Sequence, residues 1–282
     1  MKNQYYGDIN DYKKYSLIRH LTGGGELAAA VCWILTEDDS LSDGSKINYL
    51  RDPEKWRRYD PIVFEKLRKD VLVLGVRSVG NLEHSKILTN CKFYTKHIQD
   101  EIRERDKFFN EFYHFSNDVD LIFFDPDNGL EIKSVPRGRS KSSKYLYWNE
   151  LKLFYNTGSS ILLYQHFPRQ NREYYINNLV DRVFELTKTD VVFSYVTSHV
   201  LFLLIPQLEH KFYFRLRNMT ISKSWRGQIK IKEHFRDSHA NIITMKSNNL
   251  TSGQHLENFL QISVGLQFTY SIFFRTILPS YS

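Results

Sequence analysis

Short apolar runs alternate with longer segments of helical periodicity along most of the chain. The runs are 27–35, 121–124 and 160–166, and the helical segments are 9–21, 61–69, 98–115, 147–155 and 172–188. Runs this short suit strands that are buried on both faces, and strands that alternate with helices form parallel sheets. Two further runs, 191–196 and 200–206, flank Thr197-Ser198-His199, which predicts a hairpin. The expected fold is therefore α/β: a three-layer Rossmann-like sheet, mostly parallel, with a terminal antiparallel hairpin.

The length and the character of the C-terminal sequence bear on the domain organisation. A chain of 282 residues fits one large domain or one domain with an appendage. From about Ser238 onward the sequence has few charges and no clear period. We therefore expect an α/β domain over 1–237 and a C-terminal appendage over 238–282, to which the sequence assigns no role.

Cysteine usage and apolar content bear on the cellular location. Cys32 and Cys91 stand in no CxxC or histidine-rich spacing, so neither a disulfide scaffold nor a zinc site is expected. The first residues are polar and lack the apolar core of a signal peptide. No run approaches the ~20 apolar residues that cross a bilayer. The expectation is a cytoplasmic protein without a membrane partner.

The run 121–124 ends in a cluster of polar residues. It leads directly into Asp125-Pro126-Asp127-Asn128, followed by Gly129. Ligands of open α/β sheets bind at the carboxyl ends of strands. Pro126 biases Asp125 toward an extended conformation, and Gly129 permits a sharp turn. These four residues are therefore candidate catalytic residues, although the same residue types also form ordinary turns.

His166 ends the run 160–166 and should emerge at the same edge of the sheet. A histidine there can move a proton or contact a ligand, and a capping or core histidine is the alternative. Arg169 follows it closely and is a candidate for holding a phosphate or carboxylate. The two residues extend the candidate site beyond the aspartate loop.

A basic, aromatic-flanked loop follows the aspartate loop. Its candidate nucleic-acid contacts are Arg137, Arg139, Lys141 and Lys144, and the aromatic stretch "KYLYW" comes directly afterwards. Basic side chains neutralise phosphates, and aromatic rings accept stacked bases. The formal net charge of +7 also fits a polyanionic partner, although many other enzymes are equally basic. The alternative is a mobile, solvated loop.

Two of these segments together resemble the class I (Rossmann-like) adenine-N6 methyltransferases, nearest the 23S ribosomal RNA adenine-N6 branch. That branch opens with a pattern like G-N-x-x-D-x-x-K-H, and "GDINDYKKY" matches it at Gly7, Asp11 and Lys14. Asp8 stands where Asn is usual, and Tyr15 stands where His is usual. The DPDN loop is a degenerate form of the family's Asp/Asn-Pro-Pro-aromatic loop. The chain also resembles uncharacterised bacterial proteins with "DPDNG" and "YQH" at these places.

The resemblance implies S-adenosylmethionine as cofactor and a nucleic acid or nucleotide as partner. In the family, the aspartate and a proline carbonyl accept hydrogen bonds from the adenine amine, roles that fall to Asp125 and Pro126. Asp127 and Asn128 replace the second proline and the stacking aromatic, so Phe167 or an aromatic of "KYLYW" would have to stack on the base. The implied cofactor contacts are Asp8, Asp11, Lys14, Glu37, Asp43 and Gly44. We expect Asp11, Lys14 and the segment 37–44 to line one pocket with Asp125.

Three functions remain open at this point. The first is a methyltransferase-like enzyme that uses S-adenosylmethionine and acts on a nucleic acid or nucleotide, with no metal site. The second is a metal-dependent nuclease, in which Asp127 and Glu131 of the DPD-xxx-ExK stretch share Mg²⁺ and Lys133 lies near the ion. The third is a non-catalytic methyltransferase-like module that binds nucleic acid or a partner. The sequence leaves the substrate, the modified atom and the oligomeric state open.

Overall fold

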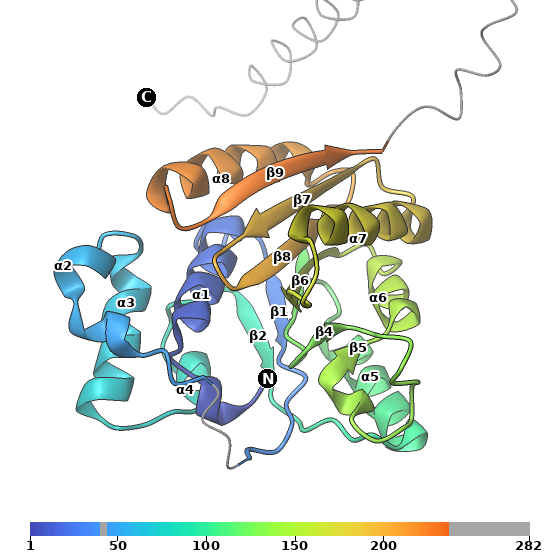
Figure 1. Ribbon diagram of the computed structural model, residues 1–282, viewed down its shortest axis with the longest axis horizontal. Helices are drawn as coiled ribbons and strands as arrows, with labels where there is room; N and C mark the ends of the chain where they lie inside the picture. The colour runs from blue at the N-terminus through green and yellow to red at the C-terminus, as the bar shows by residue number, and fades with distance from the viewer. Residues whose placement is uncertain (40–43, 237–282) are drawn as a thin grey trace, which may run out of the picture. The chain divides into compact units, whose positions relative to one another are not determined.

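A seven-stranded mixed sheet organises the residues that the computed structural model describes, which are 1–39 and 44–236 (Figure 1). In spatial order its strands are β2 (Cys91–Tyr94), β1 (Ala29–Cys32), β3 (Leu121–Phe124), β6 (Ser160–His166), β8 (Val200–Ile205), β7 (Val191–Val196) and β9 (Lys230–Phe235). The first four are parallel, and each of the last three pairs antiparallel with the strand before it in this order. The predicted fold class and closing hairpin are confirmed. The segment 238–282, predicted to be an appendage, lies outside the described residues.

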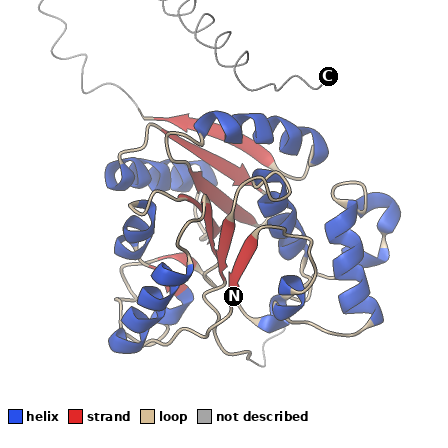
Figure 2. Cartoon of the chain, turned by 180° about the vertical axis from the view of Figure 1, so that it is seen from behind, coloured by secondary structure: helices blue, strands red, loops and turns tan. Residues whose placement is uncertain are grey.

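Helices cover both faces of the sheet and complete three layers (Figures 1 and 2). One face packs against α1 (Ile9–Leu21), α3 (Pro61–Arg68) and α8 (Lys211–Ser224), and the other against α5 (Ile102–Phe115), α6 (Trp148–Tyr155) and α7 (Arg172–Thr187). The smaller elements are α2 (Pro53–Trp56), α4 (Gly80–Glu83), a π-helical turn (Lys69–Val73), 3-10 turns (Asn3–Tyr5, Asn48–Arg51, Ser142–Lys144) and the strand pair β4 (Gly129–Leu130) and β5 (Tyr145–Leu146). None of the helices within the described ranges combines the length and the apolar character needed to span a bilayer.

The strand β3 shows why the short apolar runs form the centre of the sheet. All four of its side chains are fully buried. Leu121 and Phe123 pack into the core on one face, and Ile122 and Phe124 pack into the core on the other. Successive side chains of a strand point to opposite faces, so a strand covered on both sides must be apolar throughout.

The structure corrects the length of the first predicted strand. The run 27–35 forms a ladder only at Ala29–Cys32, because Ile34 adopts a positive φ of 47° that breaks the extended conformation. Leu35 then forms a single bridge with His97, beyond the end of β2. The chain leaving β1 therefore runs toward the carboxyl end of β2.

The strands β2 and β9 and the helix α8 had no sequence prediction. The two strands lie at the edges of the sheet. The strand β9 carries Lys230, Lys232 and Glu233, and charged side chains of this kind protect exposed sheet edges from pairing with other chains. Such a sequence lacks the apolar pattern on which strand prediction depends.

Candidate functional site

The aspartate loop at the carboxyl end of β3 is fixed to the sheet. The Asp125 N–H donates to the Cys32 carbonyl at 3.0 Å, and the Asp125 side chain is buried. Gly129 has a φ of +102°, and a Cβ there would lie 2.3 Å from the Gln165 side chain. That side chain accepts a hydrogen bond from the Leu130 N–H at 2.7 Å. The loop therefore needs glycine at 129, because β6 packs directly against it.

The opening motif forms the first turns of α1. The Asp8 side chain caps the helix by accepting a hydrogen bond from the Asn10 N–H at 2.9 Å. Gly7, with a φ of +85°, donates its N–H to Asp11 Oδ2 at 3.1 Å. The same oxygen accepts from the Tyr15 hydroxyl at 3.0 Å. These two donors orient the Asp11 carboxylate and leave its Oδ1 for another partner.

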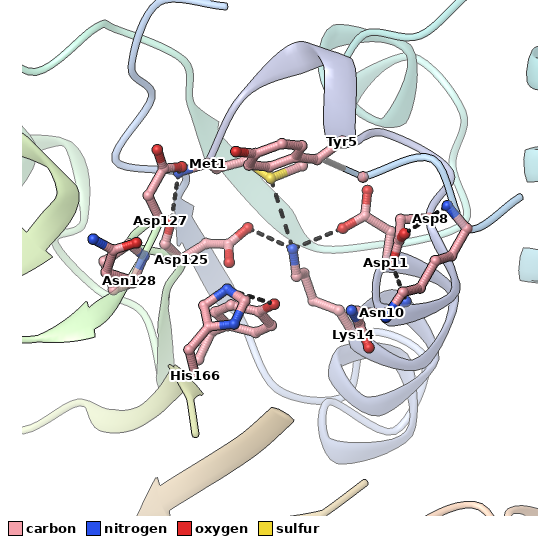
Figure 3. A pocket seen from close by; sticks show the side chains of 14 residues that line it. Met1, Tyr5, Asp8, Asn10, Asp11, Lys14, Asp125, Asp127, Asn128 and His166 are labelled. Atoms are coloured by element: carbon pink, nitrogen blue, oxygen red, sulfur yellow. Dashed lines mark hydrogen bonds and ion pairs between the residues drawn. The ribbon is translucent and has the colours of Figure 1, made fainter. Parts of the chain in front are cut away.

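Lys14 joins the opening motif to the aspartate loop (Figure 3). Its Nζ lies 2.7 Å from Asp11 Oδ1 and 2.7 Å from Asp125 Oδ2, and all three side chains are buried. It also lies 4.9 Å from the centre of the Tyr164 ring, within the range of a cation–π interaction. The structure thus brings together Asp11, Lys14 and Asp125, as the sequence analysis expected.

One ammonium is shared by two carboxylates in this cluster. Burial alone would lower the pKa of Lys14, but Asp11 and Asp125 together raise it above its ordinary value, so Lys14 stays charged. Burial raises the pKa of Asp125, and the attraction of Lys14 offsets this only in part. With both carboxylates ionised the cluster has excess negative charge. Asp125 Oδ1 makes no hydrogen bond within the described ranges, so it can accept one from a ligand.

A cavity of about 300 Å³ opens against this cluster (Figure 3). From the predicted catalytic set it is lined by Asp125, Pro126, Asp127, Asn128 and His166. From the predicted cofactor set it is lined by Asp8, Asp11, Lys14 and Gly44. Four segments far apart in the sequence, within 1–14, 44–46, 125–128 and 164–166, therefore form one concave site at the carboxyl edge of the sheet.

Asp127 has its partners within the protein. Its Oδ1 lies 2.5 Å from the amino nitrogen of Met1, and its Oδ2 accepts from the Thr36 hydroxyl at 3.0 Å. Burial alone would raise the pKa of Asp127, but the Met1 amino group and Thr36 together lower it. The carboxylate is therefore charged and held in place, and it fixes the N-terminal segment against the aspartate loop.

His166 emerges at the end of β6, as its sequence position predicts. It is exposed, and it lies on the cavity wall (Figure 3). Its Nε2 lies 3.3 Å from the Tyr164 hydroxyl, and the Tyr164 ring in turn contacts Lys14. The pair links the cavity wall to the buried lysine.

Glu37 lies away from this cavity, which corrects the expectation that it lines one pocket with Asp125. It lines a separate cavity of about 480 Å³, together with Asp39, Asp100 and Lys144. The reason is the course of the chain after β1, which the Leu35 bridge directs toward the end of β2. The remaining cofactor candidate, Asp43, lies outside the described residues.

The basic loop divides into a structural and an exposed part. Arg137 Nε donates to Glu150 Oε1 at 2.9 Å, and its Nη2 pairs with Asp106. Glu150 is buried and also pairs with the fully buried Arg105 at 2.6 Å. This network gives Arg137 a structural role, and its predicted nucleic-acid contact stays a prediction. The exposed members are Arg139 and Lys141, with Arg169 also exposed beyond β6, and Lys144 is partly buried.

Arg139→Ala/Lys141→Ala is expected to weaken binding of single-stranded RNA. It should also lower the salt dependence by roughly one unit of slope per lost phosphate contact. Arg137→Ala should instead lower the melting temperature, because it removes a partner of the buried Glu150 carboxylate. Fluorescence anisotropy at several salt concentrations and thermal melting separate the two effects. Unchanged RNA affinity in the double variant would assign this part of the loop to solvent.

The nuclease alternative needs Asp127 and Glu131 at one metal ion. Among residues 1–39 and 44–236 no three or more histidine, cysteine, aspartate or glutamate side chains are arranged to hold a metal. Glu131 pairs with Arg182 at 3.5 Å, whereas Asp127 pairs with Met1. The two carboxylates thus have different partners, and only Asp127 lines the cavity.

Several cavity residues had no sequence prediction, namely Met1, Tyr5, Asn10, Lys46 and Tyr164. Asn10 lies four positions before Lys14, so helical spacing could have found it. Lys46 reaches the site because its N–H donates to Asp8 at 3.1 Å and its carbonyl accepts from the Ile9 N–H at 3.1 Å. No sequence pattern reports a contact of this kind between distant segments.

Comparisons with known proteins show only distant likeness, and only among solved structures. No protein-family model matches the chain, and no curated protein matches it. Among solved structures it is similar to protein LPL1258 from Legionella pneumophila strain Philadelphia 1, described under the family model DUF519. The identity is 11%, the TM-score is 0.42, and the alignment covers 82% of this chain and 98% of that chain. A likeness this distant carries no information about activity.

Proposed function

We propose that this protein is an S-adenosylmethionine-dependent methyltransferase-like enzyme that acts on a nucleic acid or a nucleotide. The observation that carries the proposal is the pairing of Lys14 with Asp125. The two segments that resemble adenine-N6 methyltransferases meet there, in one cavity at the carboxyl edge of a Rossmann-like sheet. The placement of β8 between β6 and β7 gives further support, because it resembles the antiparallel end of a class I methyltransferase sheet.

The charge of the cavity suits this cofactor, which carries an ammonium and a sulfonium group. The buried cluster of Asp11, Lys14 and Asp125 has two negative groups against one positive group. Asp125 Oδ1 remains available to a donor. The negative charge of Asp11 and Asp125 would attract the cationic end without using Asp125 Oδ1 as a direct contact, and the bound cofactor would supply an electrophilic methyl group. Lys14 keeps the two carboxylates in place and limits their repulsion.

Asp125 is also suited to an amino group of the substrate base. A carboxylate oxygen and the Pro126 carbonyl can accept the two hydrogens of an exocyclic amine, which leaves the nitrogen lone pair toward the cofactor. Methylation of an amine releases a proton. His166, exposed on the cavity wall, can accept this proton and pass it to solvent.

A different aromatic residue from those predicted is placed to stack on the base. Phe167 packs under the Arg172 guanidinium at 4.5 Å, and the aromatic residues of "KYLYW" are buried. Tyr5 lines the cavity opposite His166 (Figure 3). We therefore assign base stacking to Tyr5, since stacked aromatic contacts of this kind add about 1–3 kcal/mol per base.

The proposal is tested by transfer of a labelled methyl group. The full-length protein is incubated with methyl-labelled S-adenosylmethionine and, separately, with total RNA, single-stranded DNA and free nucleotides. The nucleic acids are then digested, and the nucleosides are separated and weighed by mass spectrometry. We expect label on an exocyclic amine of a base in at least one pool. Bound cofactor with no transfer to any pool would instead support a non-catalytic binding module.

A further inference from the structure

A second buried lysine lies beside the site and has no part in the proposed chemistry. Lys13 is 1% exposed, as buried as Lys14. Its ammonium makes no hydrogen bond or ion pair with any residue of the described ranges, whereas Lys14 has two carboxylates. The ammonium is not among the fully buried polar side-chain atoms of the described ranges that lack a partner. It therefore reaches solvent at the end of a buried stem, where a partner from outside the chain can bind it.

Three more basic groups gather around Lys13. Lys46 lines the cavity. Arg172, at the start of α7, donates to the Ser198 carbonyl at 3.0 Å, which fixes it to the turn between β7 and β8. His199 lies in the same turn. Burial lowers the pKa of His199, and the nearby charges of Lys46, Lys13 and Arg172 lower it further. The turn that carries His199 and holds Arg172 lies beside the cavity, because Val200 directly after it pairs with His166 on the cavity wall. Lys46 is tied through Asp8 to the start of α1, the helix that carries Lys13.

Asp8 does not neutralise this region. Its charge opposes the lowering of the Lys13 pKa, but one of its oxygens accepts from the Asn10 N–H and the other accepts from the Lys46 N–H. Its two oxygens therefore satisfy backbone donors. One carboxylate against Lys13, Lys46 and Arg172 leaves an excess of positive charge, which suits a phosphate.

We propose that Lys13, Lys46, Arg172 and His199 bind a phosphate group of the substrate beside the cavity that receives the base. The inference rests on the proposed function and narrows its substrate class to phosphate-bearing substrates, a nucleic acid or a nucleotide, and excludes a free base or nucleoside. The cavity has an acidic side at Asp11 and Asp125 and a basic side at Lys46. A phosphate is repelled by the first and attracted by the second, so the substrate enters with its base toward Asp125.

The proposed site has a pH signature. Burial lowers the pKa of Lys13 to about 8, with Asp8 opposing this shift and Lys46 adding to it. A bound phosphate stabilises the charged ammonium and raises that pKa again. Binding above pH 8 must therefore take up a proton, and the affinity falls as the pH rises through 8. The pKa of His199 lies below its ordinary value, so His199 does not titrate in this range.

Lys13→Met tests the proposal, because methionine keeps the apolar stem and removes the ammonium. The probe is a fluorescein-labelled single-stranded RNA of mixed sequence, measured by anisotropy with the full chain. We expect an affinity loss of roughly tenfold and a salt slope lower by about one. The fall in affinity above pH 8 should disappear. The melting temperature should stay close to that of the wild-type chain, since methionine keeps the buried apolar stem and Lys13 makes no hydrogen bond or ion pair within the described ranges that would be lost. Lys107→Met, an exposed site on α5, is the matched control and should keep wild-type affinity.

Two results would overturn the proposal. One is RNA affinity, salt slope and pH dependence that are unchanged in both Lys13→Met and Lys46→Ala. The other is an RNA affinity that is unchanged in Lys13→Met, combined with a loss of inorganic phosphate binding in the same variant, as followed by phosphorus NMR. The second result would mean a site for free phosphate. Titration of the wild-type chain with S-adenosylmethionine separates this failure from failure of the proposed function, because cofactor binding does not require the phosphate site.

Discussion

Lys14→Met is expected to abolish cofactor binding and to lower the free energy of unfolding by about 3–5 kcal/mol near pH 8. The substitution leaves the buried carboxylates of Asp11 and Asp125 without the ammonium that they share. Two carboxylates that both lie 2.7 Å from one Nζ are close neighbours. Without the ammonium they repel each other in a buried site, so the pKa of the Asp11–Asp125 pair must rise. Urea denaturation of the variant at pH 5.5 and pH 8 measures the effect.

The stability of the Lys14→Met variant should change with pH in a direction that the raised carboxyl pKa fixes. Groups whose pKa is raised in the folded state bind protons more tightly there than in the unfolded chain. The stability of Lys14→Met should therefore rise as the pH falls from 8 to 5.5, as one carboxyl group becomes neutral. Lys13→Met is the matched control, because it removes a buried lysine from the same helix without separating an ion pair. If Lys14→Met lowered the free energy of unfolding by less than about 1 kcal/mol, as is typical for an exposed ion pair, the account would be contradicted.

Asp125→Ala is expected to lower methyl transfer by roughly 10³-fold or more while the chain still folds. Asp125→Asn should keep part of the activity. An amide oxygen still accepts a hydrogen bond from the substrate amine, although the charge that holds Lys14 is lost. Transfer of labelled methyl groups measures both variants, with circular dichroism as the check on folding.

The comparison of the two variants also separates the rival chemistries. A metal site needs the charge of the carboxylate. A nuclease should therefore lose activity equally in the Asp125→Asn and Asp125→Ala variants, and its activity should depend strictly on Mg²⁺. Full activity in Asp125→Ala would mean that the loop is only a turn. Asp127→Asn is a useful companion, since Asp127 pairs with Met1 and Thr36 and should act mainly on stability.

The sequence predicts the parts of the fold that depend on local pattern. The boundaries of α1, β3 and β6 match their predictions because each has a clear signal: the Asp8 cap, the run 121–124 and the run 160–166. The edge strands β2 and β9 carry charged residues instead, so a search for apolar runs does not predict them as strands. The early end of β1 depends on the positive φ of Ile34, which no residue preference indicates.

The candidate site divides in the same way. Asp11, Lys14 and Asp125 could be connected from the sequence because two short motifs place them. Tyr5 and Lys46 reach the cavity through the N-terminal segment and the loop beside Asp8, and tertiary contacts alone fix those positions. Arg137 shows a further limit, since a basic residue in a basic loop gives no sign of the buried Glu150 with which it pairs.

Calorimetric titration of the full-length chain with S-adenosylmethionine tests the central claim most directly. The account predicts one binding site in the wild-type protein and in Lys107→Met, and no binding in Lys14→Met at a pH where that variant is folded. An absence of binding heat in the wild-type protein across titration temperatures, confirmed by equilibrium dialysis, would contradict it.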